Sequence, residues 1–313
     1  FWMREAWWPK VEPMLAKSPV TGTCVTKTMG YGVSTAAWAP GVVQPIAQAV
    51  AQAIRAVAER SIWGTSGGAC RSCHRPTPAA LPTVQGSVAA NNRRMRIEIA
   101  PGIRLYIDVD GPGLVPEGPR MRERPVLLLL HGGPGFDHAS FKPLFGTLTD
   151  LAQVVYVDHR GHGRSDRRPS SEWNLDTFAD DVVRLCDALG IVKPVVLGQS
   201  YGGFVAQRYL ARHPGHPARV ILSSTSHHYG LARKLAMFER FGGLIVRAAA
   251  EAFWTDPGPA TWADYERLCR PHYNPTPQDP GGDAKQRTIS VDEILFHSAR
   301  HEMPTMDLRP GLA

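Results

Sequence analysis

From Met95 onward, the pattern of apolar and polar residues predicts strands and helices in turn. Residues 95–99 and 105–109 alternate between apolar and polar side chains, which indicates two strands joined by a Pro-Gly turn. Further strands are predicted at 125–130, 154–158, 195–198 and 219–223, and helices at 141–151, 175–189 and 201–213. Strands that alternate with helices are typical of a mostly parallel sheet covered by helices on both faces. The sequence therefore predicts an α/β fold.

The first 94 residues follow no such pattern. Five of the eight tryptophans lie there among Pro, Gly and Ala, and the chain begins with Phe1. One piece, Gln44–Arg60, has apolar residues at helical spacing and predicts a single amphipathic helix, which we expect to have little to pack on. Our hypothesis is that residues 1–94 are a disordered leader or an over-extended reading frame, with a native start near Met95.

The charge distribution supports this division of the chain. Residues 1–94 hold ten Lys and Arg against three Glu, whereas residues 95–313 hold 25 residues of each sign. Because the net charge of +7 belongs to the first third alone, it does not indicate nucleic-acid binding by the predicted fold. No apolar run reaches the length of a membrane span, and no secretory signal is evident. Five scattered cysteines offer no disulfide framework, so we expect a cytoplasmic protein that does not bind membranes.

Residues Cys70–His74 match C-x-x-C-H, the attachment pattern of a c-type haem. Covalent haem attachment requires a packed pocket and usually a second axial ligand, and neither is evident around this motif. We interpret the match as chance, and we expect no metal and no organic cofactor. A haem-binding leader fused to an enzyme is the alternative that this motif leaves open.

The sequence Gly198-Gln199-Ser200-Tyr201-Gly202 lies between a predicted strand and a predicted helix. That is the context in which G-x-S-x-G forms a nucleophile elbow, a turn so tight that the serine takes a strained backbone conformation. The hydroxyl of Ser200 then lies at a helix N-terminus, where N–H groups favour negative charge. We predict that Ser200 is the catalytic nucleophile.

A glycine-rich loop, His131–Gly135, follows the strand predicted at 125–130. Backbone N–H groups in such a loop can approach a substrate oxygen closely, so we assign one oxyanion-hole donor to Gly133 and the other to Tyr201. His131 precedes these glycines at a strand end, and we interpret it as holding the loop rather than as a general base. The charged stretch Asp158–Asp166 follows another strand, and we expect Asp158 and Arg160 to brace the loop beside the site.

The motifs HGGPG, DHRGHGRS and GQSYGG occur here in the order seen in α/β-hydrolases, and together they resemble the proline iminopeptidase-like group. The resemblance implies the α/β-hydrolase fold, with residues 95–225 as the N-terminal part of the core and 226–305 as a helical cap inserted into it. It also implies that cap glutamates meet the free amine of a substrate. Candidates are Glu251, Glu266 and Glu302, of which we select Glu302.

The resemblance breaks at the end of the chain. Relatives place the catalytic acid and histidine after two further strands, and those final strands are missing here, since residues 306–313 only resemble the start of the return to the core. We therefore expect a C-terminal truncation, an unpaired edge on the last strand, poor solubility and no complete triad. A substitute pair such as Asp292 with His301 is a further alternative, which we do not favour.

The predicted activity is hydrolysis of an amide or ester through an acyl-enzyme on Ser200, with a small molecule or short peptide as substrate. The resemblance favours release of an N-terminal proline. A carboxylesterase or lactonase of the same fold is the first alternative, and a non-catalytic α/β-hydrolase-like binding protein is the second. Epoxide hydrolases and dehalogenases are disfavoured because their nucleophile is a carboxylate.

Overall fold

The computed structural model describes residues 25–26, 48–56, 95–273 and 288–311. Its centre is a seven-stranded sheet in the order β1-β9-β8-β6-β7-β3-β2. Strands β6, β7, β8 and β9 run parallel to one another, and the antiparallel pair β2–β3 continues the sheet beyond β7, to which β3 is antiparallel. The strands are β1 (Val25–Thr26), β2 (Met95–Ala100), β3 (Ile103–Asp110), β6 (Val126–Leu130), β7 (Gln153–Val157), β8 (Val195–Gln199) and β9 (Arg219–Ser223).

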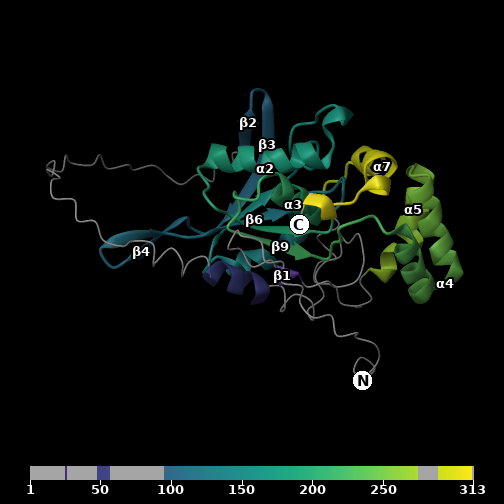
Figure 1. Cartoon of the computed structure of the whole chain (residues 1–313), viewed down its shortest axis with the longest axis horizontal. Helices are drawn as coiled ribbons and strands as arrows, with labels where there is room; N and C mark the ends of the chain where they lie inside the picture. The colour runs from purple at the N-terminus through teal and green to yellow at the C-terminus, as the bar shows by residue number, and fades with distance from the viewer. Residues whose placement is uncertain (1–24, 27–47, 57–94, 274–287, 312–313) are drawn as a thin grey trace, which may run out of the picture.

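Two helices cover one face of this sheet, α2 (Leu175–Leu189) and α3 (Tyr201–Arg212), with α2 drawn above the sheet in Figure 1. Helix α2 begins where the Asn174 side chain accepts a hydrogen bond from Thr177 N, and it ends at Gly190 in the left-handed conformation. Alternate strand residues such as Leu128 and Val196 face these helices in one apolar cluster. The predicted bounds of both helices are confirmed to within one residue.

The opposite face is covered differently from the prediction. The helix expected over residues 141–151 is two 3₁₀ turns instead, η1 (His138–Phe141) and η2 (Leu144–Leu148). Pro143 separates them, because the residue before a proline is pushed out of the helical region and Lys142 is extended here. Phe141 and Phe145 nevertheless reach the core and pack with strand residues such as Leu129.

The N-terminal region contributes to the same face, contrary to our expectation that its helix has nothing to pack on. Residues 48–56 form a helix, drawn in purple below the sheet in Figure 1, and Val50 and Ile54 are fully buried against the face that holds Leu129. Strand β1 pairs parallel with β9, so the expected unpaired edge of β9 is partly covered. The amphipathic pattern predicted this helix, but its packing partners lie far away in the sequence.

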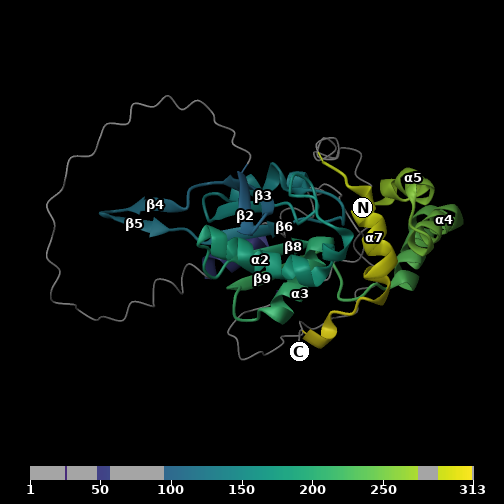
Figure 2. The ribbon, with the colours of Figure 1, turned by 90° about the horizontal axis from the view of Figure 1, so that it is seen from above.

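Helices α4 (Leu231–Thr255), α5 (Pro259–Leu268) and α7 (Asp292–His301) lie together at one end of the molecule, beyond the sheet (Figure 2). We call them the cap helices. Gly243, with φ 77° and ψ −172°, breaks α4 into two helical segments. A two-stranded hairpin that the sequence analysis missed, β4 (Leu114–Glu117) with β5 (Arg120–Glu123), projects at the opposite end. After α7 the chain returns to the core side, where Leu308 is buried and its N–H donates to His227 O. The division at residues 225 and 226 stays a prediction.

Short 3₁₀ turns complete the described elements: η3 (Ser170–Glu172), η4 (Arg270–His272), η5 (Met303–Thr305) and η6 (Arg309–Gly311). Within the described ranges, no helix has both the length and the apolar character that crossing a membrane requires.

Candidate active site

Ser200 occupies the turn between β8 and α3, as the motif predicts. Its backbone angles are φ 53° and ψ −115°, a combination that non-glycine residues rarely adopt. The strain is held from both sides, because Ser200 N donates to Ser223 O at 2.9 Å and Thr225 Oγ1 donates to Ser200 O at 2.8 Å. The end of β9 thus fixes the conformation of Ser200, which is buried at 3% exposure.

The glycines of the elbow are required by close packing. A Cβ atom added at Gly202 would lie 2.5 Å from the carbonyl carbon of Leu130 and 2.6 Å from His131 O. One added at Gly198 would lie 2.7 Å from the Ala206 Cβ. Side-chain atoms do not approach other atoms this closely, so both positions exclude any larger residue.

The two predicted oxyanion-hole donors are brought to neighbouring strand ends. Strands β6 and β8 are parallel, with Leu130 opposite Gly198, and Gly133 and Tyr201 each follow three residues later. Gly133 has φ 131°, a conformation that favours glycine. Tyr201 is the first residue of α3, whose first N–H groups have no partner within the helix. Their joint action on a substrate oxygen stays a prediction.

His131 holds the loop, in agreement with its expected role. The buried ring keeps both nitrogens occupied: Nδ1 lies 2.7 Å from Gly132 O, and Nε2 accepts from His159 N at 3.1 Å. Burial lowers the pKa of His131, so the ring is neutral at pH 7. A general base needs a free nitrogen that faces the nucleophile, and this arrangement leaves His131 none.

Asp158 and Arg160 brace the adjacent loop as expected. Asp158 accepts hydrogen bonds from His138 N at 3.0 Å and Arg164 N at 2.9 Å, and it contacts His138 Nδ1 at 2.6 Å. Burial opposes the charged form, but the hydrogen bond and charge of His138 outweigh it and lower the pKa of Asp158. Arg160 forms a two-pronged ion pair with Asp181, at 2.8 and 2.5 Å.

Asp137 is a buried residue of this region that the sequence analysis missed. Its Oδ2 atom accepts hydrogen bonds from Arg164 at 2.8 Å and from Ile289 N at 3.1 Å. Nearby, Val291 N donates to Gly135 O at 2.7 Å. The glycine loop is therefore joined directly to the segment that leads into α7. Because Ile289 is 152 residues further along the chain, no local sequence signal could have revealed this contact.

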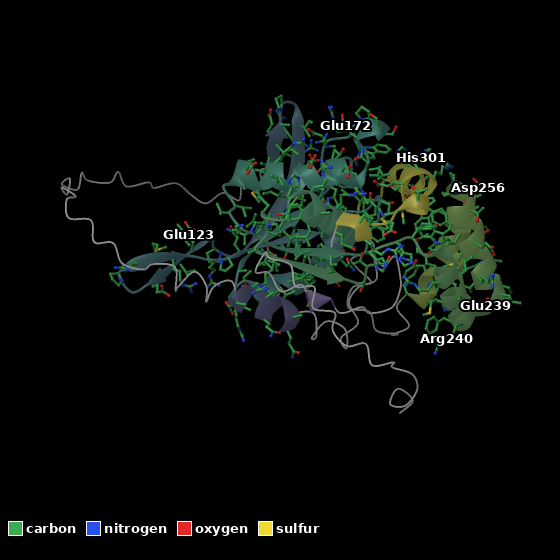
Figure 3. All side chains as sticks on the ribbon, viewed as in Figure 1. Glu123, Glu172, Glu239, Arg240, Asp256 and His301 are labelled. Atoms are coloured by element: carbon green, nitrogen blue, oxygen red, sulfur yellow. The ribbon has the colours of Figure 1, made fainter. Side chains whose placement is uncertain are left out.

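No hydrogen bond in the described part of the chain joins a histidine to Ser200. His213 pairs with Asp180 at 2.8 Å, and His216 contacts Tyr209. The substitute pair Asp292 with His301 is wrong, since these residues begin and end the ten-residue helix α7 and their Cα atoms are about 13 Å apart. His301, labelled at α7 in Figure 3, is exposed.

Glu302 lies just after α7, and its carboxylate accepts from Leu175 N at 2.9 and 3.2 Å. Leu175 is the first residue of α2, so the negative charge lies at a helix N-terminus, where it is favoured. Burial raises the pKa of Glu302. The other two glutamates that we considered face arginines, Glu251 near Arg247 and Glu266 beside Arg270. A contact between Glu302 and a substrate amine stays a prediction.

Among the described residues, no group of three or more His, Cys, Asp and Glu side chains could hold a metal ion. The C-x-x-C-H motif at residues 70–74 lies outside the described residues.

Comparison with known proteins agrees with this geometry. Residues 125–254 match a family model described as alpha/beta hydrolase fold. The chain is 31% identical over 129 residues to the proline iminopeptidase PfmaB of Pestalotiopsis fici, covering 40% of this chain and 45% of that protein. It is 30% identical over 130 residues to the 2-hydroxymuconate semialdehyde hydrolase of a Pseudomonas species, covering 41% of this chain and 42% of that protein. The chain thus spans less than half the length of these curated relatives.

Among solved structures, the crystal structure of a proline iminopeptidase from Mycobacterium smegmatis superimposes with a TM-score of 0.53. Its sequence identity is 21%, and the superposition covers 69% of this chain and 76% of that chain. At this identity the likeness concerns the fold. The strand order, the strained serine between β8 and α3, and the matched residues 125–254 agree, and the chain has the α/β-hydrolase fold.

Proposed function

We propose that this chain carries the nucleophile of a serine hydrolase, which forms an acyl-enzyme on Ser200. The observation that carries the proposal is the strained backbone of Ser200 at a strand-to-helix turn whose glycines leave no room for a side chain. Such strain persists only where the surrounding structure holds it, and it concentrates at functional sites. The matched family model covers this elbow.

In the proposed reaction, Ser200 Oγ attacks the carbonyl carbon of an ester or amide while a base takes the hydroxyl proton. The tetrahedral oxyanion accepts hydrogen bonds from Gly133 N–H and Tyr201 N–H. The base then gives its proton to the departing alcohol or amine, and water releases the acyl group by the same steps. No hydrogen bond among the described residues joins a histidine to Ser200, so the proposal assigns no residue as the base.

For the substrate, an amide of N-terminal proline is the first candidate. It is supported by the HGGPG sequence and by the proline iminopeptidase among the relatives. An ester or lactone is the second candidate. In its favour, Glu251, Glu266 and Glu302 each lie beside an arginine or accept a backbone N–H, which leaves them less available to a substrate amine.

The test is reaction of the purified chain with a fluorophosphonate probe, which labels activated serines, with Ser200→Ala as the control. Labelling of the wild type but not of the control supports the proposal. An unlabelled but folded wild type overturns it for this chain and favours the binding-protein alternative. Turnover of a proline arylamide against a short acyl ester then separates the two candidate substrates.

A further inference from the structure

Helix α4 begins in a way that lacks an internal explanation. Its N-cap is Gly230, which provides no capping side chain, and its first turn contains no acidic residue. Instead, Arg233 and Lys234 follow at once, although cations are disfavoured at a helix N-terminus. The His228 ring and the Arg233 guanidinium also converge over Gly230, since a Cβ added there would lie 3.3 Å from His228 Nε2 and 3.5 Å from Arg233 Nη2.

The Lys234 ammonium group is the second, independent observation. Its Nζ atom is buried and has no hydrogen-bond partner among the described residues. It lies instead over the rings of Tyr229, at 4.0 Å from the ring centre, and Trp254, at 4.3 Å. Burial and the nearby Arg233 lower the pKa of Lys234 to about 7. A buried amine without a polar partner is costly, and a bound anion would relieve this cost.

Among the described residues, the His228 ring adds a second unpartnered nitrogen at the start of α4. His228 Nδ1 is buried without a partner in the described part of the chain. Asp307 pairs with His228 through the backbone, but its carboxylate already accepts from Arg309 at 2.9 Å. The described surroundings of Lys234 therefore provide positive charge and N–H groups at a helix N-terminus, which is the chemistry of an anion site.

The chain connects this cluster directly to the nucleophile. Thr225 holds Ser200 O, and residues 226–230 lead from there into α4. Tyr229 and Trp254 also belong to the same continuous apolar cluster as Tyr201. Residues 226–230 thus link the elbow to the start of α4, which holds Lys234.

We propose that the N-terminus of α4, with Lys234 and His228, binds a carboxylate of the substrate. This inference rests on the proposed hydrolase function. It assigns an anionic group of the substrate, in place of a free amine, to the start of α4. The geometry does not by itself separate a substrate carboxylate from a free inorganic anion. The experiment therefore uses both kinds of probe.

Binding of butyrate, of its neutral analogue butyramide and of inorganic phosphate to the full chain is measured by calorimetry. The variant is Lys234→Met, which keeps an unbranched side chain and removes the ammonium group. The control is Arg240→Met, a change of the same kind at an exposed position of α4, at the end of the cap helices away from Asp256 (Figure 3). A charge-assisted hydrogen bond corresponds to a change of about tenfold or more in affinity.

We expect the wild type and Arg240→Met to bind butyrate more tightly than butyramide, and Lys234→Met to lose this preference by about tenfold. Bound butyrate should also slow fluorophosphonate labelling of Ser200. Equal binding of butyrate and butyramide, or an unchanged preference in Lys234→Met, overturns the proposal. Binding of phosphate without butyrate overturns the assignment to a carboxylate.

Two further readouts separate the possible failures. If Lys234→Met does not fold, the test becomes proton uptake by the wild type on binding butyrate at pH 7.5. A partly neutral lysine that gains an anion takes up a proton, so the absence of uptake counts against the site. Should Ser200 not be labelled while butyrate binding still depends on Lys234, the hydrolase proposal fails and the anion site stands.

Discussion

Acidification should destabilise the protein through His162, because this ring is buried where its charged form is poorly solvated. The side chain is inaccessible, Nδ1 lies 2.8 Å from Arg160 O, and Nε2 has no partner among the described residues. Burial, reinforced by the charge of His131, lowers the pKa of His162 to about 3. In the unfolded chain the same ring titrates near its ordinary value of 6.5.

Because the folded pKa lies below the unfolded one, the unfolded state binds the proton first as the pH falls. The contribution of His162 is complete above pH 6.5 and is lost between pH 6.5 and about 3. Each unit in that window costs about 1.4 kcal/mol, so at pH 5.0 the loss is about 2 kcal/mol from this one ring. His159, which is buried beside it and whose pKa also lies well below its ordinary value, adds to the loss.

The assay is urea unfolding, followed by tryptophan fluorescence, at pH 7.5 and pH 5.0. His162→Asn keeps an N–H donor and removes the titration, so the difference in unfolding free energy between the two pH values should shrink by about 2 kcal/mol. His301→Asn, at an exposed position, is the matched control and should leave the difference unchanged. An equal pH dependence in His162→Asn and the wild type would refute the reasoning.

Two further predictions concern packing. Gly202→Ala should lower the free energy of unfolding by about 3 kcal/mol or more and abolish labelling of Ser200, since the new methyl group collides with the Leu130 carbonyl. The control is Gly215→Ala, whose methyl group meets nothing within 4 Å and should leave the free energy of unfolding unchanged in the same urea assay. Ile54→Ala should lower the free energy of unfolding by about 2–5 kcal/mol because Ile54 is only 1% exposed. Gln52→Ala, on the exposed side of the same helix, should leave it unchanged. Equal effects of the two substitutions would show that residues 48–56 do not pack on the core.

The parts of this fold that the sequence predicted are those that local physics determines. Short apolar runs specified strands β6 to β9, and the glycines on both sides of Ser200 specified the elbow, because each needs only neighbours in the chain. The 3₁₀ turns at η1 and η2 were missed although the signal was present. Pro143 interrupts an apolar pattern that otherwise fits a helix.

The contacts that escaped prediction join distant segments. The amphipathic pattern of residues 48–56 predicts a helix but cannot say that its apolar side packs on Leu129. In the same way, Asp137 is an ordinary acidic residue in the sequence, and only the fold brings it to Ile289 N. The ring contact of Lys234 with Trp254 joins residues on the two sides of the break at Gly243 in α4. Long-range packing decides such positions, and it leaves no periodic mark in the chain.

The elbow and the glycine loop are coupled through one backbone contact, which bears on how substrate choice is divided within the molecule. Gly202 packs against the carbonyl groups of Leu130 and His131, so the pairing of β6 with β8 fixes Tyr201 relative to Gly133. The sheet thus sets the relative position of these two N–H groups, and the hydrogen bond from Val291 N to Gly135 O joins the same loop to the segment before α7. Under the anion site proposed above, Lys234 adds selection among acyl groups from the start of α4.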